Sequence, residues 1–196
     1  SRTFAGLSPD ECINQSYEHA NGLLEGSPIE TGKYDVIFNQ EVLKSVLDCF
    51  GNLFWAKAAI NKLNPFKDKL GTQVAAKTLT ITDSPLYQDG YNYSVFDSEG
   101  NSCSNTILIK DGVLNSFFHN SATAKELGQE NTFNASRSPK GSLGVSGTQK
   151  VIGKGSDDII DITKEKFFNI VSVQGIHSGA DIMSGDFSFA ASGYLV

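Results

Sequence analysis

The residues best suited to chemistry gather in one glycine-rich stretch near the C-terminus, residues 174–188. One imidazole, two carboxylates and two hydroxyls stand there between glycines: His177, Asp181, Ser184, Asp186 and Ser188. Glycine lets a backbone turn tightly, so these side chains can converge on one polar site. His177, Asp181 and Asp186 are candidates for acid/base catalysis. Alternatively, Asp186 accepts backbone N–H bonds in a Gly–Asp turn.

A catalytic zinc site is not recognisable in this sequence. Such a site needs three protein ligands and one position left open for water. The histidines and cysteines lie in six separate segments, without helical i, i+4 spacing or a C-x-x-C pair: His19, His119, His177, Cys12, Cys49 and Cys103. We therefore predict no metal ligand, no cofactor, and free thiols in a reducing compartment. A Ser–His–Asp site stays open because its members need not be close in sequence, but no G-x-S-x-G elbow supports it.

Two predicted strands flank the glycine-rich stretch. Residues 167–174 carry apolar side chains on both alternating faces, which is typical of a strand buried on both sides. Phe187, Phe189 and Ala191 alternate along a closing strand, with small residues opposite, where another backbone or a ligand can come close. The candidate site is therefore expected in a loop between two strands.

The beginning of the chain predicts two helices and a strand. Ser8 before a proline and a glutamate is typical of a capped helix start, and its apolar residues recur at spacings of three and four. That spacing indicates a buried face: Ile13, Tyr17, Ala20 and Leu24. Residues 33–38 alternate as a strand, and Asn39 can cap a helix over residues 40–54 with a broad apolar face.

The middle of the chain indicates antiparallel strands. Residues 106–110 and 113–118 favour β structure and are separated by Asp-Gly at 111–112, which predicts a hairpin with a type I′ turn. Residues 78–82 and 93–96 are further predicted strands.

Three shorter signals lie around this hairpin. The Asp-Ser-Glu-Gly sequence at 97–100 predicts a turn, since acids before glycine usually serve turn chemistry. Ser121 can cap a helix over residues 122–127 that ends at Gly128. Residues 138–147 are rich in Ser, Gly and Pro and are predicted to be a loop.

Composition and charge exclude several classes of function. With 196 residues the chain can form one domain with a sizeable core or two small ones that share it, and we expect one domain over residues 1–196. Its 22 acidic and 16 scattered basic residues argue against direct nucleic-acid binding. No run of 18 apolar residues occurs, so no membrane-spanning helix is expected. The chain lacks an initiator methionine and a signal segment, which suggests a fragment or processed product.

Several stretches together carry a family resemblance. A Gln-Gly-x-His-x-Gly run begins at Gln174 and leads into Ser-Gly-Asp-Phe-Ser, ending at Ser188. Residues 131–137 resemble a Gly-Asn-Ala-x-Arg run, with Phe133 where that run often has glycine. These stretches resemble the TldD/PmbA family of metallopeptidases, in particular its PmbA (TldE) branch. The resemblance implies the family's C-terminal α+β domain, a largely antiparallel β-sheet with a few packed helices, without the N-terminal α/β half.

The resemblance also implies a function. In the family's catalytic branch, the helix equivalent to residues 40–54 is expected to carry an H-E-x-x-x-H zinc motif, but here it contains no histidine. The implied role is a zinc-free, PmbA-like component that works with a TldD-like zinc-bearing subunit on peptides or small proteins in the cytoplasm. Asn134 and Arg137 would bind the peptide through their amide and guanidinium groups. The C-terminal loop would contribute four further contacts to the peptide: His177, Ser184, Asp186 and Ser188. Alternatively, Arg137 is an exposed loop residue with no special role.

Two other functions stay open. The chain can be a non-enzymatic module that captures a peptide or protein partner, or an independent hydrolase that uses His177 and Asp186. The family is also associated with modulation of DNA gyrase, but the acidic charge of this chain does not support direct contact with DNA. Self-association is a further expectation, because long apolar strands need cover at their edges.

Overall fold

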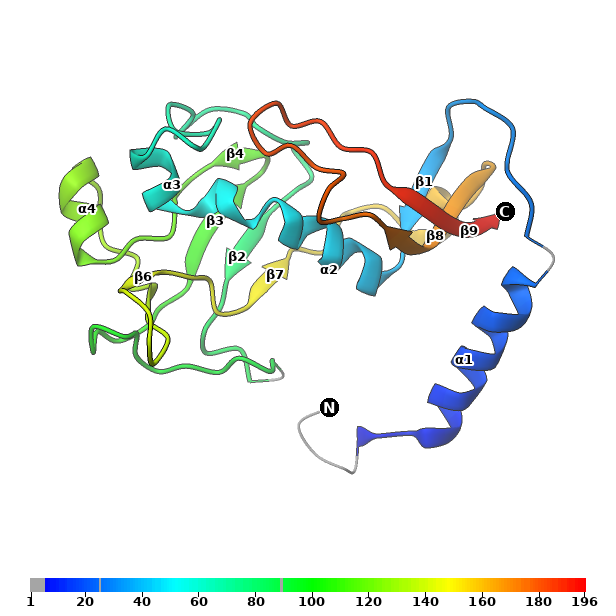
Figure 1. The fold of residues 1–196 in the computed structure, drawn as a ribbon, viewed down its shortest axis with the longest axis horizontal. Coiled ribbons are helices and arrows are strands. Elements are labelled where there is room, and N and C mark those ends of the chain that lie inside the picture. The colour runs from blue at the N-terminus through cyan, green and yellow to red at the C-terminus, as the bar shows by residue number, and fades with distance from the viewer. Residues whose placement is uncertain (1–5, 25, 89) are drawn as a thin grey trace. The chain divides into compact units, whose positions relative to one another are not determined.

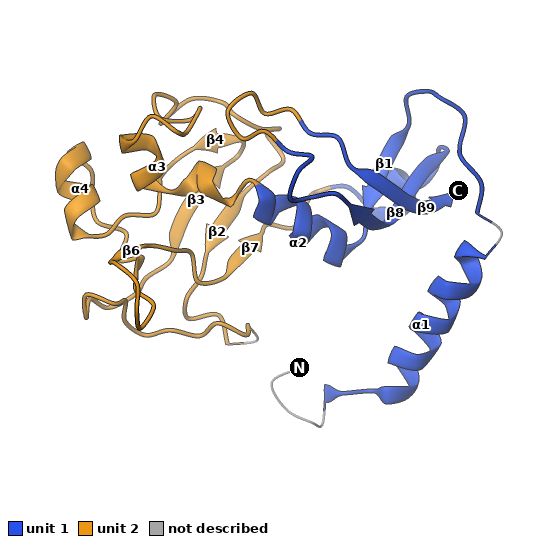
Figure 2. Cartoon of the chain, viewed as in Figure 1, with its two compact units in different colours: residues 1–49, 157–180, 187–196 blue, residues 50–156, 181–186 orange. Residues whose placement is uncertain are grey.

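The computed structural model describes residues 6–24, 26–88 and 90–196. Short helices combine with mostly antiparallel sheets, so the predicted α+β class is confirmed (Figure 1). The chain forms two compact units, which Figure 2 colours separately. Unit 1 comprises residues 1–49, 157–180 and 187–196, and unit 2 comprises residues 50–156 and 181–186. Within the described ranges, no helix is both long and apolar enough to cross a lipid bilayer.

Unit 1 is built on a three-stranded sheet in the order β1–β8–β9. The central strand β8 (Phe167–Gln174) pairs parallel with β1 (Asp35–Phe38) and antiparallel with β9 (Ala190–Leu195). The predicted strand over residues 167–174 is therefore confirmed at both ends. Parallel pairing needs a long connection, and here all residues between β1 and β8 in the sequence provide it.

The closing strand β9 begins later than predicted. Ser188 N donates to the Gly179 carbonyl over 2.7 Å, so the chain before β9 pairs with the loop instead of with β8. Further along β9, a Cβ on Gly193 would lie 2.9 Å from the carbonyl carbon of Asn169. The expected close approach at a small residue is therefore real, and the approaching group is the backbone of β8.

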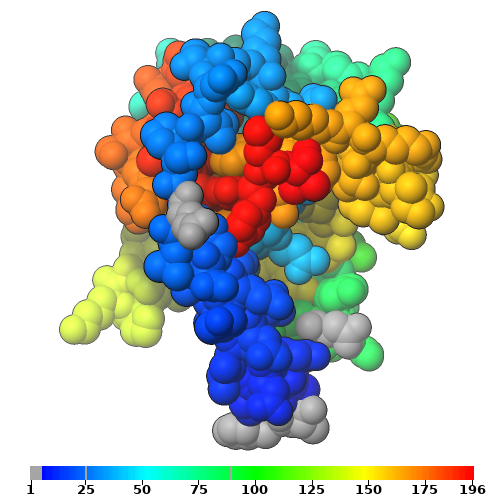
Figure 3. Space-filling view, turned by 90° about the vertical axis from the view of Figure 1, so that its right-hand side faces the viewer, coloured from blue at the N-terminus to red at the C-terminus, as the bar shows by residue number. Residues whose placement is uncertain are grey.

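Helix α1 (Pro9–Leu23) begins where the sequence predicts. The Ser8 hydroxyl accepts a hydrogen bond from Glu11 N over 3.4 Å, and Pro9 occupies the first turn. The prediction of a buried face is wrong: Ile13 is 64% exposed and Tyr17 67%, and α1 has no buried residue. Figure 3 shows α1, in dark blue, at the surface. A cap is a local contact and forms alone, whereas burial needs a partner that the described residues do not supply.

Helix α2 (Gln40–Cys49) confirms the predicted cap, because Asn39 Oδ1 accepts a hydrogen bond from Val42 N over 2.8 Å. The predicted helix over residues 40–54 is interrupted. A 3₁₀ turn η2 (Gly51–Phe54) follows α2, since the backbone leaves the helical region at Phe50 and glycine is a poor helix former. A last short helix of unit 1, α5 (Ile159–Ile162), starts at Asp158, whose carboxylate accepts from Ile160 N.

Unit 2 contains a four-stranded antiparallel sheet in the order β4–β3–β2–β7. The bounds of its strands are β2 (Ile81–Asp83), β3 (Thr106–Lys110), β4 (Val113–Leu114) and β7 (Lys150–Ile152). A separate antiparallel pair joins β5 (Ala135–Ser136) to β6 (Gly144–Val145). The predicted loop over residues 138–147 therefore includes a short strand, β6, at its end.

The hairpin between β3 and β4 confirms the Asp-Gly signal. Asp111 and Gly112 have φ angles of 49° and 77°, and a type I′ turn requires positive φ at both positions. The second strand ends at Leu114 instead of Phe118, because Asn115 N and Ser116 N both donate to the Leu108 carbonyl, which interrupts the regular ladder.

Two local predictions around the hairpin are wrong by small margins. Helix α4 (Ser121–Leu127) is capped by Asn120, whose Oδ1 accepts from Thr123 N over 2.9 Å, and not by Ser121. Gly128 ends it in the left-handed conformation, as predicted. Residues 93–96 form no strand and make one bridge, at Phe96, because Ser94 N turns back to the Pro85 carbonyl.

The core of unit 2 lies between the sheet and the helical segment formed by η2 and α3 (Ala56–Ile60). Its large buried members come mostly from β3, β4 and the segment after β4: Leu108, Leu114, Phe117 and Phe118. The same segment continues into His119 and Asn120, which are also buried. Polar residues are thus drawn into the interior directly beside the apolar core.

Candidate binding pocket

The glycine-rich loop keeps its polar side chains at the surface. Asp181 Oδ1 accepts from Met183 N over 2.8 Å and from Ser184 N over 3.3 Å, and Ser184 Oγ accepts from Asp186 N over 3.1 Å. The carboxylate of Asp181 therefore accepts the backbone N–H bonds of this turn, whereas Asp186 takes part through its backbone N–H. His177 and Ser188 are exposed and belong to unit 1, whereas Ser184 and Asp186 belong to unit 2. The acid/base pairing of His177 with Asp186 stays a prediction.

Asn134 and Arg137 lie in very different surroundings. Asn134 is buried, and its Nδ2 donates to Asp83 Oδ2 over 2.9 Å and to the Ser146 carbonyl over 3.4 Å. Arg137 is exposed and donates from Nε to the Gly141 carbonyl over 3.3 Å. The Asn134 amide therefore holds parts of unit 2 together, and a contact of either residue with a peptide stays a prediction.

Asp83, at the end of β2, is the acceptor at the centre of this network. Its carboxylate is fully buried and accepts from Thr148 N over 2.8 Å, Thr148 Oγ1 over 2.9 Å and Gln149 N over 2.7 Å, in addition to Asn134. A buried carboxylate is tolerated only with such donors. Nothing local in the sequence reveals these donors, which are located 51 to 66 residues away from Asp83.

Asp97 performs the predicted turn chemistry and also a second task. Its Oδ1 accepts from Glu99 N over 3.0 Å and Asn101 N over 2.9 Å, and Gly100 completes the turn with a φ of 82°. Its Oδ2 accepts from Ala135 N over 3.3 Å, so the turn is joined to β5. Asp97 therefore positions residues 97–100 against β5, which lies within the family-like Asn-Ala-x-Arg run at residues 134–137.

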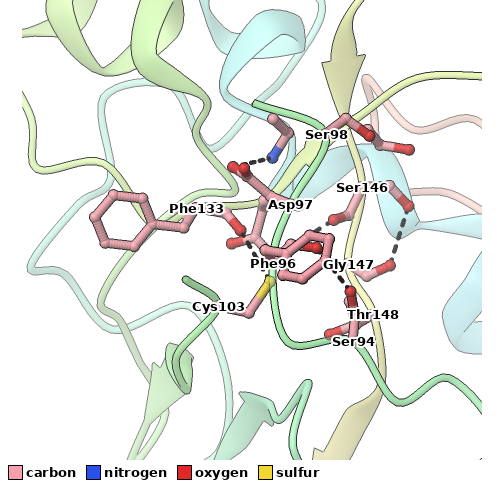
Figure 4. A pocket seen from close by; sticks show the side chains of 12 residues that line it. Ser94, Phe96, Asp97, Ser98, Cys103, Phe133, Ser146, Gly147 and Thr148 are labelled. Carbon is pink, nitrogen blue, oxygen red and sulfur yellow. Dashed lines mark hydrogen bonds between the residues drawn. The ribbon is translucent and has the colours of Figure 1, made fainter. Parts of the chain in front are cut away.

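A cavity of about 180 Å³ opens where these segments meet (Figure 4). Three stretches of unit 2 form its walls. Five residues with hydroxyl groups line the cavity together with Asp97: Ser94, Ser98, Ser136, Ser146 and Thr148. At about 30 Å³ for each molecule, the cavity holds roughly six waters. This polar pocket is suited to bind a small polar group.

Cys103 is one of the residues that line the pocket. The thiol donates to the Phe133 carbonyl over 3.7 Å and is buried. Burial raises the pKa of the Cys103 thiol, the negative charges of Asp97 and Asp83 raise it further, and a hydrogen bond with Ser94 acts against them. A thiol with a raised pKa is a poor nucleophile at neutral pH, so Cys103 is a lining residue and no candidate for covalent catalysis.

Phe133 precedes Asn134 with an unusual backbone. Its φ of 57° lies in the left-handed region, which glycine adopts easily and a residue with a Cβ adopts only with strain. The position is the one where the family-like run often has glycine. The bend at Phe133 brings the Asn134 amide toward Asp83, while the Phe133 ring points away from the other labelled side chains in Figure 4.

His119 is buried near the start of α4. No described atom forms a hydrogen bond with its Nδ1, and its ring meets the ring of Phe117 edge to face at 6.5 Å between centroids. Burial lowers the pKa of His119, and a hydrogen bond to the backbone of Thr123 only partly offsets this effect. The imidazole is therefore held neutral inside unit 2. Among the described residues, no three His, Cys, Asp or Glu side chains gather as a possible metal site.

Comparison with known proteins identifies the class first. The sequence model for the PmbA/TldA metallopeptidase C-terminal domain matches residues 31–196. The chain belongs to the PmbA/TldD family, as its sequence patterns predict.

Individual relatives agree with this assignment. A metalloprotease of Methanothermobacter thermautotrophicus is 29% identical over 185 residues, which cover 93% of this chain and 40% of the relative. Metalloprotease PmbA of Escherichia coli O157:H7 is 30% identical over 171 residues, which cover 86% of this chain and 35% of that protein. The chain thus spans less than half the length of these curated relatives.

Two solved structures share the fold. A candidate modulator of a DNA gyrase from Thermotoga maritima matches with a TM-score of 0.90 and 30% identity over 100% of this chain and 45% of its own. TldE from Thermococcus kodakarensis matches with a TM-score of 0.78 and 20% identity, over 87% of this chain and 39% of its own. At that identity the second match concerns the fold alone.

Proposed function

We propose that this chain is a zinc-free, PmbA-like component of a TldD-type metallopeptidase system that degrades peptides or small proteins. Membership of the PmbA/TldD family supports the assignment to such a system. The names of its relatives, metalloprotease and PmbA, support peptide hydrolysis as the reaction of that system. In this role the chain binds substrate or completes an assembly, and a zinc-bearing, TldD-like subunit performs the hydrolysis.

The observation that carries the proposal is the composition of α2 and the turn after it. Residues 40–54 contain no histidine, and Glu41 and Asp48 are their only carboxylates. Both are exposed and lie seven residues apart, which is about 10 Å along a helix axis. Two carboxylates at that separation cannot share one ion. The residues present on α2 therefore do not fit a catalytic zinc, and we assign no catalytic step to this chain.

Exposure supports a binding role for the predicted loop residues. His177, Ser184, Asp186 and Ser188 are exposed, as is Arg137. These side chains offer hydroxyl and carboxylate acceptors and a guanidinium donor to the amides and the carboxylate of a peptide. They are the residues we propose to contact substrate.

A peptidase assay tests the proposal. The purified chain is mixed with a zinc-bearing TldD-type protein, and cleavage of a fluorogenic peptide library is followed. We expect no turnover by the chain alone and a gain in turnover on mixing. A variant with Arg137→Ala and Asp186→Ala should reduce the gain. Turnover by the chain alone that is abolished by His177→Ala would instead establish an independent hydrolase.

Metal analysis of the purified chain provides a second measurement. We expect zinc well below one equivalent, and one bound zinc per chain would overturn the proposal. An unchanged rate on mixing, together with measurable peptide binding, would favour a non-enzymatic module that captures peptides. The acidic surface gives no reason to expect direct binding to DNA in either case.

A further inference from the structure

The pocket in unit 2 has a distinctive charge balance. Asp97 is the charged residue among the twelve that line it, and no lysine, arginine or histidine is among them. The buried carboxylate of Asp83 lies directly behind, bonded to the lining residues Asn134 and Thr148. Arg137, one residue beyond the lining residue Ser136, directs Nε to the Gly141 carbonyl. The pocket is therefore a site of negative potential. Burial is the main cause of the raised pKa of Cys103, and the negative charges of Asp97 and Asp83 raise that pKa further, in agreement with this potential.

Three acceptors in the lining have unused capacity. Asp97 Oδ2 accepts one hydrogen bond, from Ala135 N, and a carboxylate oxygen has two lone pairs. The hydroxyls of Ser98 and Ser136 make no hydrogen bond with the described part of the chain. The two serines lie close together along the backbone: the carbonyl of Ala135 accepts a hydrogen bond from Ser98 N over 3.0 Å, and Ser136 is the next residue after Ala135. The other hydroxyls are engaged: Ser94 with Phe96, Ser146 with Gly147, and Thr148 with Asp83.

We propose that this pocket binds a primary ammonium group through Asp97 Oδ2 and the hydroxyls of Ser98 and Ser136. A primary ammonium has three N–H donors and no acceptor, which matches three open acceptors beside one negative charge. Phe96, which lines the same pocket, offers an aromatic ring to the methylene groups or the charge of the ligand. The size of the pocket suits a lysine side chain or the first residue of a peptide. That the ammonium belongs to a peptide rests on the proposed function, whereas the chemistry of the pocket does not.

An NMR titration of the full chain tests this inference. The ¹⁵N-labelled protein receives N-acetyl-lysine methylamide, or its norleucine counterpart, which has the same methylene chain without the amine. A third probe, glycylglycine methylamide, carries an α-ammonium and separates a peptide N-terminus from a lysine side chain. We expect saturable shifts of the amide signals of Ser98, Ala135 and Ser136 with at least one amine probe, and none with norleucine.

Matched charge controls sharpen the result. Tetramethylammonium has the charge but no N–H donor. It should therefore bind at least about tenfold more weakly than the amine probe, a difference of about 1.4 kcal/mol. Asp97→Asn should weaken binding by at least about tenfold, and Ser136→Ala by a smaller factor. Equal shifts with norleucine, equal binding of tetramethylammonium, or an unchanged affinity of Asp97→Asn would each overturn the inference, as would the absence of any shift.

Asp97 also holds a turn, so a second variant covers the case that Asp97→Asn does not fold. Ser98→Lys places an ammonium from the chain itself beside the pocket and should abolish binding of the amine probe. Ser98→Leu is the matched control: its side chain has a similar bulk without the charge, so it measures the effect of steric occlusion alone. Undiminished binding to Ser98→Lys would overturn the inference. If the chain stimulates a TldD-type partner but does not bind the amine probes, the proposed function holds and the ammonium site is refuted. If the chain binds the amine probes but does not stimulate the partner, the ammonium site holds and the proposed function is refuted.

Discussion

Asn134 donates a hydrogen bond from Nδ2 to Oδ2 of Asp83 over 2.9 Å, although 51 residues separate them in the chain. Both side chains are buried, and the carboxylate also receives the three donors of Thr148 and Gln149. This contact joins the end of β2 to the strand pair β5–β6 and so builds the wall of the pocket. The side chain of Asn134, which the sequence predicts to contact substrate, therefore stabilises the fold of unit 2.

Replacing Asp83 by alanine should destabilise unit 2 strongly. The change removes the acceptor of four hydrogen bonds, one buried and three part-buried, and we expect a loss of about 3 kcal/mol in the free energy of unfolding. The fluorescence of Trp55, the single tryptophan of the chain, reports unfolding of unit 2 in urea. Asp68→Ala is the control, since that side chain is 82% exposed and should matter by less than about 0.5 kcal/mol. Equal midpoints for the two variants would contradict the role of Asp83.

At position 133, a glycine variant should be more stable than an alanine variant, which is the reverse of the usual order of stability. At a φ of 57°, alanine keeps the strain of a Cβ and glycine does not, so Phe133→Gly should be more stable than Phe133→Ala by about 1 kcal/mol. Lys125, exposed in α4, is the control position, where alanine should exceed glycine by about 1 kcal/mol. The same order at both positions would show that the left-handed backbone at Phe133 is not strained.

The stability of unit 2 should depend on pH through His119. Burial lowers the pKa of His119 in the folded chain below its ordinary value of 6.5. Between the two values the unfolded chain binds more protons, so the free energy of unfolding falls as the pH drops below about 6.5. His119→Phe, which keeps an aromatic ring and removes the titration, should flatten this slope between pH 5 and 7.

The exposed His19 provides the control for this titration. His19→Phe should leave the pH dependence of the Trp55 unfolding midpoint unchanged, because His19 is solvated and belongs to unit 1. If His119→Phe and the original chain lost stability with the same slope, another group would have to account for the acid sensitivity.

The three cysteines should react with alkylating reagents at very different rates. Cys12 is exposed, Cys49 is half-buried and Cys103 is buried with a raised pKa. Since the thiolate is the reactive form, we expect iodoacetamide at pH 8 to modify Cys103 at least about tenfold more slowly than Cys12. Mass spectrometry of peptides from a time course measures the order. Fast modification of Cys103 in the folded chain would show that its thiol is accessible and ionised.

Local sequence patterns predicted the elements whose causes are local. The helix cap at Ser8, the cap at Asn39 and the type I′ turn at residues 111–112 each depend on contacts within a few residues, and the structure confirms all three. The β8 strand was predicted from its apolar content for the same reason. Errors arose where a partner decides the outcome, as with the exposed face of α1 and the missing strand at residues 93–96.

The sequence by itself determined the family, the α+β class and the absence of histidine from residues 40–54, because motifs and composition are properties of the chain alone. Only the tertiary structure decided which polar residues meet. Asp97 reaches Ala135 across 38 residues, and Asp83 reaches Gln149 across 66. Hydrogen bonds between segments so distant leave no periodic or local trace in the sequence, so the pocket that they enclose becomes visible only once the chain is folded.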